Sequence, residues 1–108
     1  MFQLTVLYGQ PQDPQAFDRY YEQTHAPLAL KIPGIKGYTA SRVVSLNPQE
    51  SSPYYLIAAL YFDSEEAMGA AFQSPEGLAA AGDVQNFATG GVTMLAGGAQ
   101  VYDPVALG

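Results

Sequence analysis

The sequence predicts a single α+β domain in which helices cover one face of a four-stranded antiparallel sheet. The chain of 108 residues has the length of one domain. The spacing of apolar side chains gives segments in the order strand, helix, strand, strand, helix, strand. The third strand, residues 54–62, is apolar on both faces, so we expect a packed layer on each side of it.

The first strand and the first helix are predicted within residues 2–30. Residues 2–8 place their larger apolar side chains at alternate positions, as a strand does. Asp13 and Pro14 form an N-cap followed by a proline at the first helical position. Proline disfavours helical geometry in the residue before it, so Pro27 should end or kink the helix near residues 24–26, unless a last turn runs through Leu30.

The second and third strands follow as a hairpin. Residues 37–46 alternate and read as a strand, residues 47–53 form a polar loop that contains two prolines, and residues 54–62 form the apolar strand.

Residues 63–108 should contain the second helix and the last strand. The run Asp-Ser-Glu-Glu at residues 63–66 supplies a cap and an acidic first turn. Ser74 and Pro75 restart a short helical piece that reaches about residue 81. We expect a turn and a loop over residues 83–91, although Val84, Phe87 and Ala88 have helical spacing. A strand should follow over residues 92–103, with a bulge or bend at its glycine pair, and then a tail over residues 104–108.

This order of elements is the ferredoxin-like βαββαβ arrangement, with both helical regions on one face of the sheet. The chain has no further segment to cover the other face. Charged residues make up only 13% of the chain, which is too few to cover the whole surface of a small domain. We therefore expect a homodimer that forms through the open sheet faces.

Composition excludes several classes of function. The net charge of −6, with only four basic residues, disfavours nucleic acid and anionic membranes as partners. The absence of cysteine excludes disulfides and thiolate chemistry. The N-terminal residues do not form a secretion signal, and no apolar run is long enough to span a bilayer, so we expect a cytoplasmic protein.

One stretch of the chain resembles a known family. The pattern is Phe17-x-x-Tyr20-Tyr21-x-x-x-His25-x-Pro27-Leu28, followed by Ile32-Pro33-Gly34-Ile35-x-Gly37-Tyr38. It resembles the EthD family of the dimeric α+β barrel superfamily, and the resemblance in length and element order takes in residues 1–108 as a single EthD-like domain. It implies a homodimer whose two sheets form a barrel, with a pocket between helices and sheet in each subunit. The superfamily includes small polyketide cyclases, cofactor-free monooxygenases and muconolactone isomerases.

His25 is the first candidate for catalysis. It lies four residues after Tyr21, so the two side chains are neighbours on the inward face of the helix. An imidazole titrates near neutral pH and can move a proton to or from a substrate. The alternative is a structural histidine that bonds a backbone carbonyl near Pro27, and no carboxylate partner is visible in the sequence.

Tyrosines and one arginine are the candidates for substrate binding. A tyrosine supplies an apolar wall with a hydrogen-bonding tip, although each one can equally be ordinary packing. Arg42 could bind a ligand carboxylate or pair with an acid such as Asp63 or Glu50. The predicted substrate-binding residues are Tyr20, Tyr38, Tyr61, Phe17 and Arg42, beside the catalytic candidates His25 and Tyr21.

The sequence predicts neither a metal nor a cofactor. One histidine with scattered carboxylates is too small a ligand set for a metal, and the glycine pair Gly97-Gly98 is not followed by the lysine of a phosphate loop. Haem ligation by His25, known in larger barrel relatives, is the least favoured option.

Two hypotheses of function remain. The first is an enzyme that acts on a small apolar oxygenated or aromatic compound, either by proton transfer as an isomerase, cyclase or lyase, or by cofactor-free oxidation. The second is a non-catalytic protein that binds a hydrophobic metabolite or supports a partner oxygenase, which the lack of a partner for His25 favours. The sequence leaves open whether the protein is an enzyme.

Overall fold

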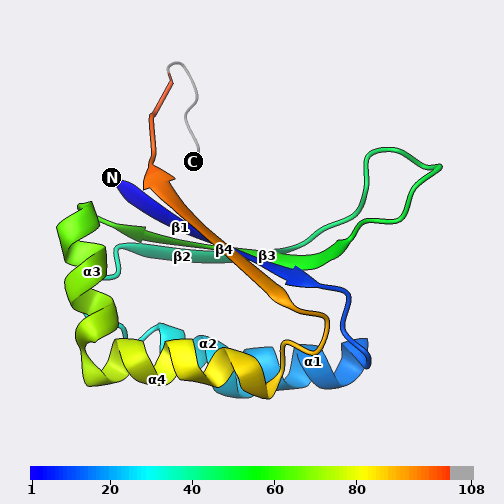
Figure 1. The fold of residues 1–108 in the computed structure, drawn as a ribbon, viewed down its shortest axis with the longest axis horizontal. Helices are drawn as coiled ribbons and strands as arrows, with labels where there is room; N and C mark the ends of the chain where they lie inside the picture. The colour runs from blue at the N-terminus through cyan, green and yellow to red at the C-terminus, as the bar shows by residue number, and fades with distance from the viewer. Residues whose placement is uncertain (103–108) are drawn as a thin grey trace.

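A computed structural model describes residues 1–102 as one sheet with helices on one side of it (Figure 1). Strands β1, β3 and β4 span Phe2–Gly9, Tyr54–Phe62 and Val92–Gly98, and β2 spans Gly37–Arg42. The helical segments are α1 Pro14–Tyr20, η1 Tyr21–His25, α2 Ala26–Ala29, α3 Glu65–Gln73, α4 Pro75–Asp83 and η2 Val84–Asn86. The predicted α+β, ferredoxin-like order of elements is confirmed.

The sheet has the order β2-β3-β1-β4, and every neighbouring pair is antiparallel. Strand β3 therefore lies between β1 and β2, and β1 lies between β3 and β4. This is the split βαβ topology, in which each helical region crosses from one strand to the next but one. The two central strands are the apolar ones, because only they have a neighbour on each side.

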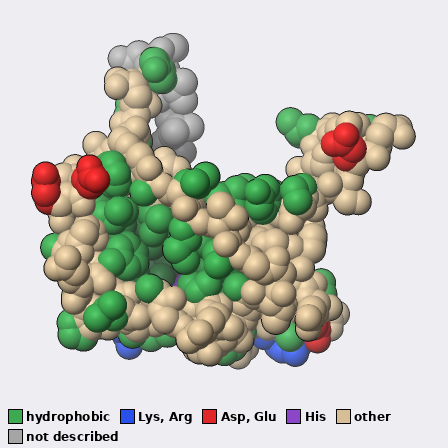
Figure 2. All heavy atoms as spheres, in the orientation of Figure 1, with side chains coloured by type: hydrophobic (Ala, Val, Ile, Leu, Met, Phe, Trp, Pro, Cys, Tyr) green, Lys and Arg blue, Asp and Glu red, His purple; other side chains and the backbone are tan. Residues whose placement is uncertain are grey.

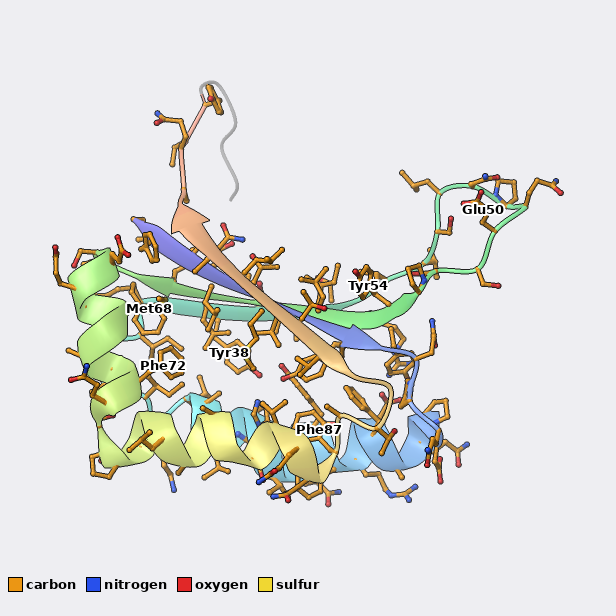
Figure 3. All side chains as sticks on the ribbon, in the orientation of Figure 1. Tyr38, Glu50, Tyr54, Met68, Phe72 and Phe87 are labelled. Carbon is orange, nitrogen blue, oxygen red and sulfur yellow. The ribbon has the colours of Figure 1, made fainter. Side chains whose placement is uncertain are left out.

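The core lies between the sheet and the helices. Alternate residues of β3 and β1 face the helices, and Tyr8 and Phe62 are the largest side chains that are completely buried there. Phe87, from the segment after η2, packs against the ring of Tyr8 with 5.4 Å between centroids (Figure 3). Burial of these aromatic rings holds the helices on the sheet.

The expectation that Pro27 ends the first helix is wrong in part. The helix begins as predicted at Pro14, where the Asp13 side chain accepts a hydrogen bond from the amide of Ala16. It then widens into the π-helical turn η1, in which the amide of Ala26 donates to the carbonyl of Tyr21, and it continues through α2. The wider turn relieves the clash between the proline ring and the carbonyl four residues earlier, so the helix survives Pro27.

The second helical region turns a corner at Ser74. The Ser64 and Ser74 side chains cap α3 and α4 by accepting hydrogen bonds from Ala67 and Gly77 amides. A Cβ at Gly77 would lie 1.9 Å from the carbonyl oxygen of Ala71, so only glycine allows the two helices to meet this closely.

The loop predicted from residue 83 begins later than expected. Helix α4 runs to Asp83 and continues as the 3₁₀ turn η2 to Asn86, because the apolar side chains Val84 and Phe87 are buried against the core. This correction places Asp83 on a helix, inside the protein.

Two strands are shorter than predicted. β2 ends at Arg42 instead of residue 46, and the chain then projects as a long loop beyond the sheet (Figure 1). β4 ends at the glycine pair, at Gly98, instead of continuing to residue 103. The predicted end of that strand at residue 103 and the tail 104–108 lie outside the described residues.

The face of the sheet away from the helices carries no layer from the described part of the chain (Figure 1). It presents the residues that alternate with the buried ones, among them Leu7, Ile57 and Leu95, the last 60% exposed. Among residues 1–102, no helix is long and apolar enough to cross a bilayer. A partner at the open face remains a prediction.

Candidate active site

A cavity of about 270 Å³ lies between the sheet and the helices. Figure 2 shows it as a hollow lined by hydrophobic side chains, with the purple of the chain's single histidine at its depth. Figure 3 shows Tyr38 of β2 and Met68 and Phe72 of α3 in the space between the sheet and α4. Most of the wall is apolar and comes from all four strands and from α2, α3 and α4.

Four of the lining residues carry a polar side-chain group: Tyr8, Tyr21, His25 and Tyr38. Among residues 1–102, none of the basic and none of the acidic side chains is part of the lining. In such an environment a hydrogen bond is stronger than in water, because the surrounding dielectric is low.

His25 is buried and is held by Asp83. Its Nδ1 lies 3.0 Å from Oδ2 of that carboxylate, and the two side chains are each only 8% exposed. The other oxygen, Oδ1, accepts hydrogen bonds from the Tyr20 hydroxyl at 2.6 Å and from Nδ2 of Asn86 at 3.1 Å. The carboxylate thus has three donors around it, which is how a buried charge is stabilised.

The surroundings of this pair fix its protonation state. Burial raises the pKa of Asp83, but the hydrogen bonds from Tyr20, Asn86 and His25 outweigh this effect and hold the pKa below its ordinary value. Burial lowers the pKa of His25 below 6.5, against the opposing effect of Asp83. At neutral pH the carboxylate is therefore charged and the imidazole neutral.

The tautomer of His25 follows from that state. An ionised carboxylate only accepts hydrogen bonds, so Nδ1 carries the proton and Nε2 carries the lone pair. Within residues 1–102, Nε2 makes no hydrogen bond, and no side-chain nitrogen or oxygen that lacks a partner is sealed from solvent. Since the ring lines the cavity, its basic nitrogen is available there.

Tyr21 and Tyr38 form a hydroxyl pair on the wall of the cavity, with 2.5 Å between their oxygens. Burial raises the pKa of each phenol, so both stay protonated. One hydroxyl donates to the other, which leaves one proton of the pair free to donate to a ligand oxygen. The ring of Tyr21 also packs against His25 at 5.2 Å between centroids.

The structure thus brings three predicted site residues together on the cavity wall: His25, Tyr21 and Tyr38. Phe17 is buried behind them, stacked on Tyr21 with its ring 10° from parallel. Tyr20 points to Asp83 and is not part of the lining.

Tyr61 and Arg42 are also away from the cavity. Tyr61 alternates with the buried residues of β3 and lies on the open face of the sheet, beside Gly37. Arg42 pairs with Asp18, with 2.5 Å between Nη2 and Oδ2, and its guanidinium lies 5.0 Å from the ring centroid of Tyr55. The expectation of Asp63 or Glu50 as the partner of Arg42 is wrong, because β2 ends at Arg42 and places it over helix α1.

Asp83 is the residue that the sequence analysis missed. The statement that His25 lacks a carboxylate partner is wrong, since that partner comes from the end of α4, 58 residues later. A signal existed: Asp83 stands directly before the helically spaced apolar residues Val84 and Phe87. Its inward direction could have been inferred only if α4 had been extended to it.

The chain matches the model of the EthD domain over residues 9–91. It is 50% identical over 95 residues to an uncharacterised 11.0 kDa protein in the thcB–thcC intergenic region of Rhodococcus erythropolis, covering 88% of this chain and 91% of the relative. The crystal structure of an EthD family protein from Bacillus halodurans is 39% identical with a TM-score of 0.86, covering 93% of this chain and 99% of the other.

A more distant structure shares only the fold. The hydroxynitrile lyase of Passiflora edulis is 16% identical with a TM-score of 0.70, covering 95% of this chain and 97% of the other. The match over residues 9–91 includes the whole stretch from Phe17 to Tyr38 that suggested the family and also Asp83. By its sequence and its fold, the chain belongs to the EthD family.

Proposed function

We propose that this protein catalyses proton transfer on a small, uncharged, apolar compound that contains oxygen, without a cofactor. His25 is the general base, Asp83 orients it, and the Tyr21–Tyr38 hydroxyl pair holds the substrate oxygen. The observation that carries the proposal is the buried His25 ring, whose Nδ1 lies 3.0 Å from the Asp83 carboxylate and which lines an apolar cavity.

The simplest reaction of this class begins at a carbon next to a carbonyl. Nε2 of His25 takes a proton from that carbon, and the electron pair of the broken C–H bond moves to the carbonyl oxygen. The free proton of the tyrosine pair donates a hydrogen bond to the enolate oxygen, while Asp83 stabilises the imidazolium. In an isomerisation, the imidazolium returns the proton to another carbon that is conjugated with the enolate. In a cyclisation, the enolate attacks a second carbonyl, and the imidazolium gives its proton to the alkoxide that forms.

The balance of charge supports this assignment of roles. The lowered pKa of His25 keeps it in the basic form at neutral pH, and the ionised Asp83 becomes a stronger partner once the ring is protonated. The apolar wall excludes water that would otherwise compete for the enolate oxygen. A positioned base of this kind contributes about 10²–10⁴-fold to a rate.

The test is hydrogen–deuterium exchange on a simple ketone. In deuterated buffer, the protein should accelerate exchange of the protons next to the carbonyl of 1-tetralone. NMR measures the rate of this exchange. His25→Ala should reduce the acceleration by roughly 10²-fold or more. Tyr61→Phe, on the open face of the sheet, is the control and should leave it unchanged. Equal exchange rates for wild type and His25→Ala would remove His25 from the mechanism.

A non-catalytic binding protein is the second candidate. The almost wholly apolar wall of the cavity favours it, because such a wall binds a hydrophobic metabolite without any chemistry. Binding of tetralone by the wild type without accelerated exchange would support this candidate.

We also propose that two copies associate through their open sheet faces. Leu7, Ile57 and Leu95 form an apolar surface there, and the projecting loop exposes Val44 and Leu46, the latter completely. Light scattering after size exclusion should give the mass of a dimer at micromolar concentration. Leu95→Lys should give a monomer, and a wild-type monomer would refute the association.

A further inference from the structure

We propose that the hydroxyl of Tyr8, on strand β1, is a ligand-binding group that donates a hydrogen bond to the oxygen of an uncharged carbonyl compound in the cavity. This inference rests on the proposed function only in using the same cavity, and it holds whether or not the bound compound reacts. The sequence analysis did not single out Tyr8 as a site residue.

Tyr8 is fixed in place by its neighbours. It is 1% exposed, and three aromatic rings surround it: Phe17 at 5.5 Å, Tyr21 at 5.8 Å and Phe87 at 5.4 Å between centroids. Packing from several sides leaves the ring a single rotamer. The direction of the hydroxyl is therefore set before any ligand arrives, which reduces the entropy cost of binding.

The hydroxyl of Tyr8 has no partner in the part of the chain that the structure describes. No hydrogen bond joins it to another group of residues 1–102, although every sealed side-chain oxygen and nitrogen there has one. Because Tyr8 lines the cavity, the small area that it leaves open faces that space. An unpaired hydroxyl beside an apolar cavity favours a ligand that brings an acceptor, because pairing the two recovers free energy.

The ligand that suits this site is uncharged. Arg19, Lys31, Lys36 and Arg42 are absent from the lining, so a carboxylate or phosphate would enter without a counter-charge. The carboxylate that bonds the lining residue His25, that of Asp83, is itself negative. Burial raises the pKa of Tyr8, which keeps its hydroxyl a donor.

The size of the cavity limits the size of the ligand. A cavity of about 150 Å³ with apolar walls holds one benzene molecule. The 270 Å³ available here suits a substituted single ring or two fused rings. A bicyclic ketone such as 1-tetralone therefore matches the site in size, charge and acceptor.

The experiment compares two probes that differ in one oxygen. 1-Tetralone and tetralin have the same carbon skeleton, and only the ketone can accept a hydrogen bond. We expect Tyr8→Phe to weaken the binding of tetralone by about 3- to 12-fold, the loss of one hydrogen bond, measured by NMR titration. Binding of tetralin should not change.

Protein stability provides an independent readout. Because the hydroxyl makes no internal hydrogen bond, Tyr8→Phe should unfold in urea at the same or a higher concentration than wild type. Tyr61→Phe is the matched control, with an equal change of atoms outside the cavity, and should bind both probes as wild type does.

Each contrary result overturns the inference. Equal affinity of wild type and Tyr8→Phe for tetralone would show that the hydroxyl does not bind the carbonyl, and failure of wild type to bind either probe would refute the ligand class. Equal weakening for both probes would assign the effect to packing, and clear destabilisation would assign the hydroxyl an internal role. Binding is measured without turnover, so His25→Ala that binds tetralone but does not exchange its protons separates this inference from the proposed function.

Discussion

Asp83 and Asp18 make similar contacts in two parts of the molecule. Each carboxylate accepts a hydrogen bond from a tyrosine hydroxyl, Asp83 from Tyr20 and Asp18 from Tyr55. Each also pairs with a basic side chain, His25 for Asp83 and Arg42 for Asp18. The difference lies in exposure: the side chains of His25 and Asp83 are each 8% exposed, whereas those of Arg42 and Asp18 are 57% and 33% exposed.

Exposure and the identity of the base give the two clusters different uses. The Asp18 cluster joins β2 and β3 to α1. Its arginine stays protonated and therefore has no nitrogen that could accept a proton. A histidine can be neutral, and burial keeps it so. Water screens the Asp18 pair, while the Asp83 pair interacts in a medium of lower dielectric. The same pattern of contacts therefore links strands to a helix at the surface in one place and holds a base inside the protein in the other.

The largest difference should appear when each carboxylate is removed. Asp83→Ala should lower the free energy of unfolding by about 1–3 kcal/mol, because it leaves the buried Nδ1–H of His25 without an acceptor. Asp18→Ala should lower it by less than about 1 kcal/mol. Urea denaturation of both variants measures these changes. Similar losses of stability in the two variants would contradict the difference between the buried and the exposed cluster.

Asp83→Asn keeps the shape of the side chain, so it can be tested for activity even if Asp83→Ala folds poorly. It should reduce tetralone exchange on the order of tenfold, since the imidazole is no longer held in one tautomer. Asp18→Asn is the matched control and should exchange at the wild-type rate.

A change of pH should have an effect of intermediate size on the stability of the folded protein. The pKa of His25 is lowered in the folded protein, so below its ordinary value of 6.5 the unfolded chain binds more protons than the folded one. Stability should be complete above about pH 6.5 and should decrease as the pH falls through the lowered pKa of the folded state. His25→Gln should remove this dependence, whereas Arg42→Gln should retain it. Urea midpoints at several pH values between about 5 and 8 decide the matter, and an unchanged slope in His25→Gln would contradict the assigned pKa direction.

The smallest effect should be that of salt concentration on the destabilisation caused by these substitutions. The Asp18–Arg42 pair is partly exposed, so the destabilisation caused by Arg42→Ala should be less than about 1 kcal/mol at low ionic strength and smaller still near 1 M NaCl. The destabilisation caused by Asp83→Asn should change little with salt. Thermal unfolding at two salt concentrations makes the comparison, and an equal response of the two variants would refute the difference in screening.

Much of the fold could be predicted because its signals are local. The alternation of residues 54–62, the Asp13–Pro14 start and the Ser74–Pro75 corner each depend on neighbours within a few residues. The expectation that Pro27 ends the helix is wrong in part, because a π turn formed under tertiary packing lets the helix continue to Ala29, within the alternative of a last turn through Leu30. The candidate site was predicted where it lies on one helix, at Tyr21 and His25, and on the strand that follows, at Tyr38.

The sequence by itself determined the order of the strands and helices, the apolar third strand and the helical face that carries Tyr21 and His25, because periodicity and capping act over a few residues. Only the tertiary structure decided that Asp83 meets His25, that Arg42 pairs with Asp18 and that Tyr8 lines the cavity. These contacts join residues 24 to 58 positions apart or depend on how several elements pack together. Their formation follows from the burial of the whole apolar surface, which no single stretch of sequence encodes.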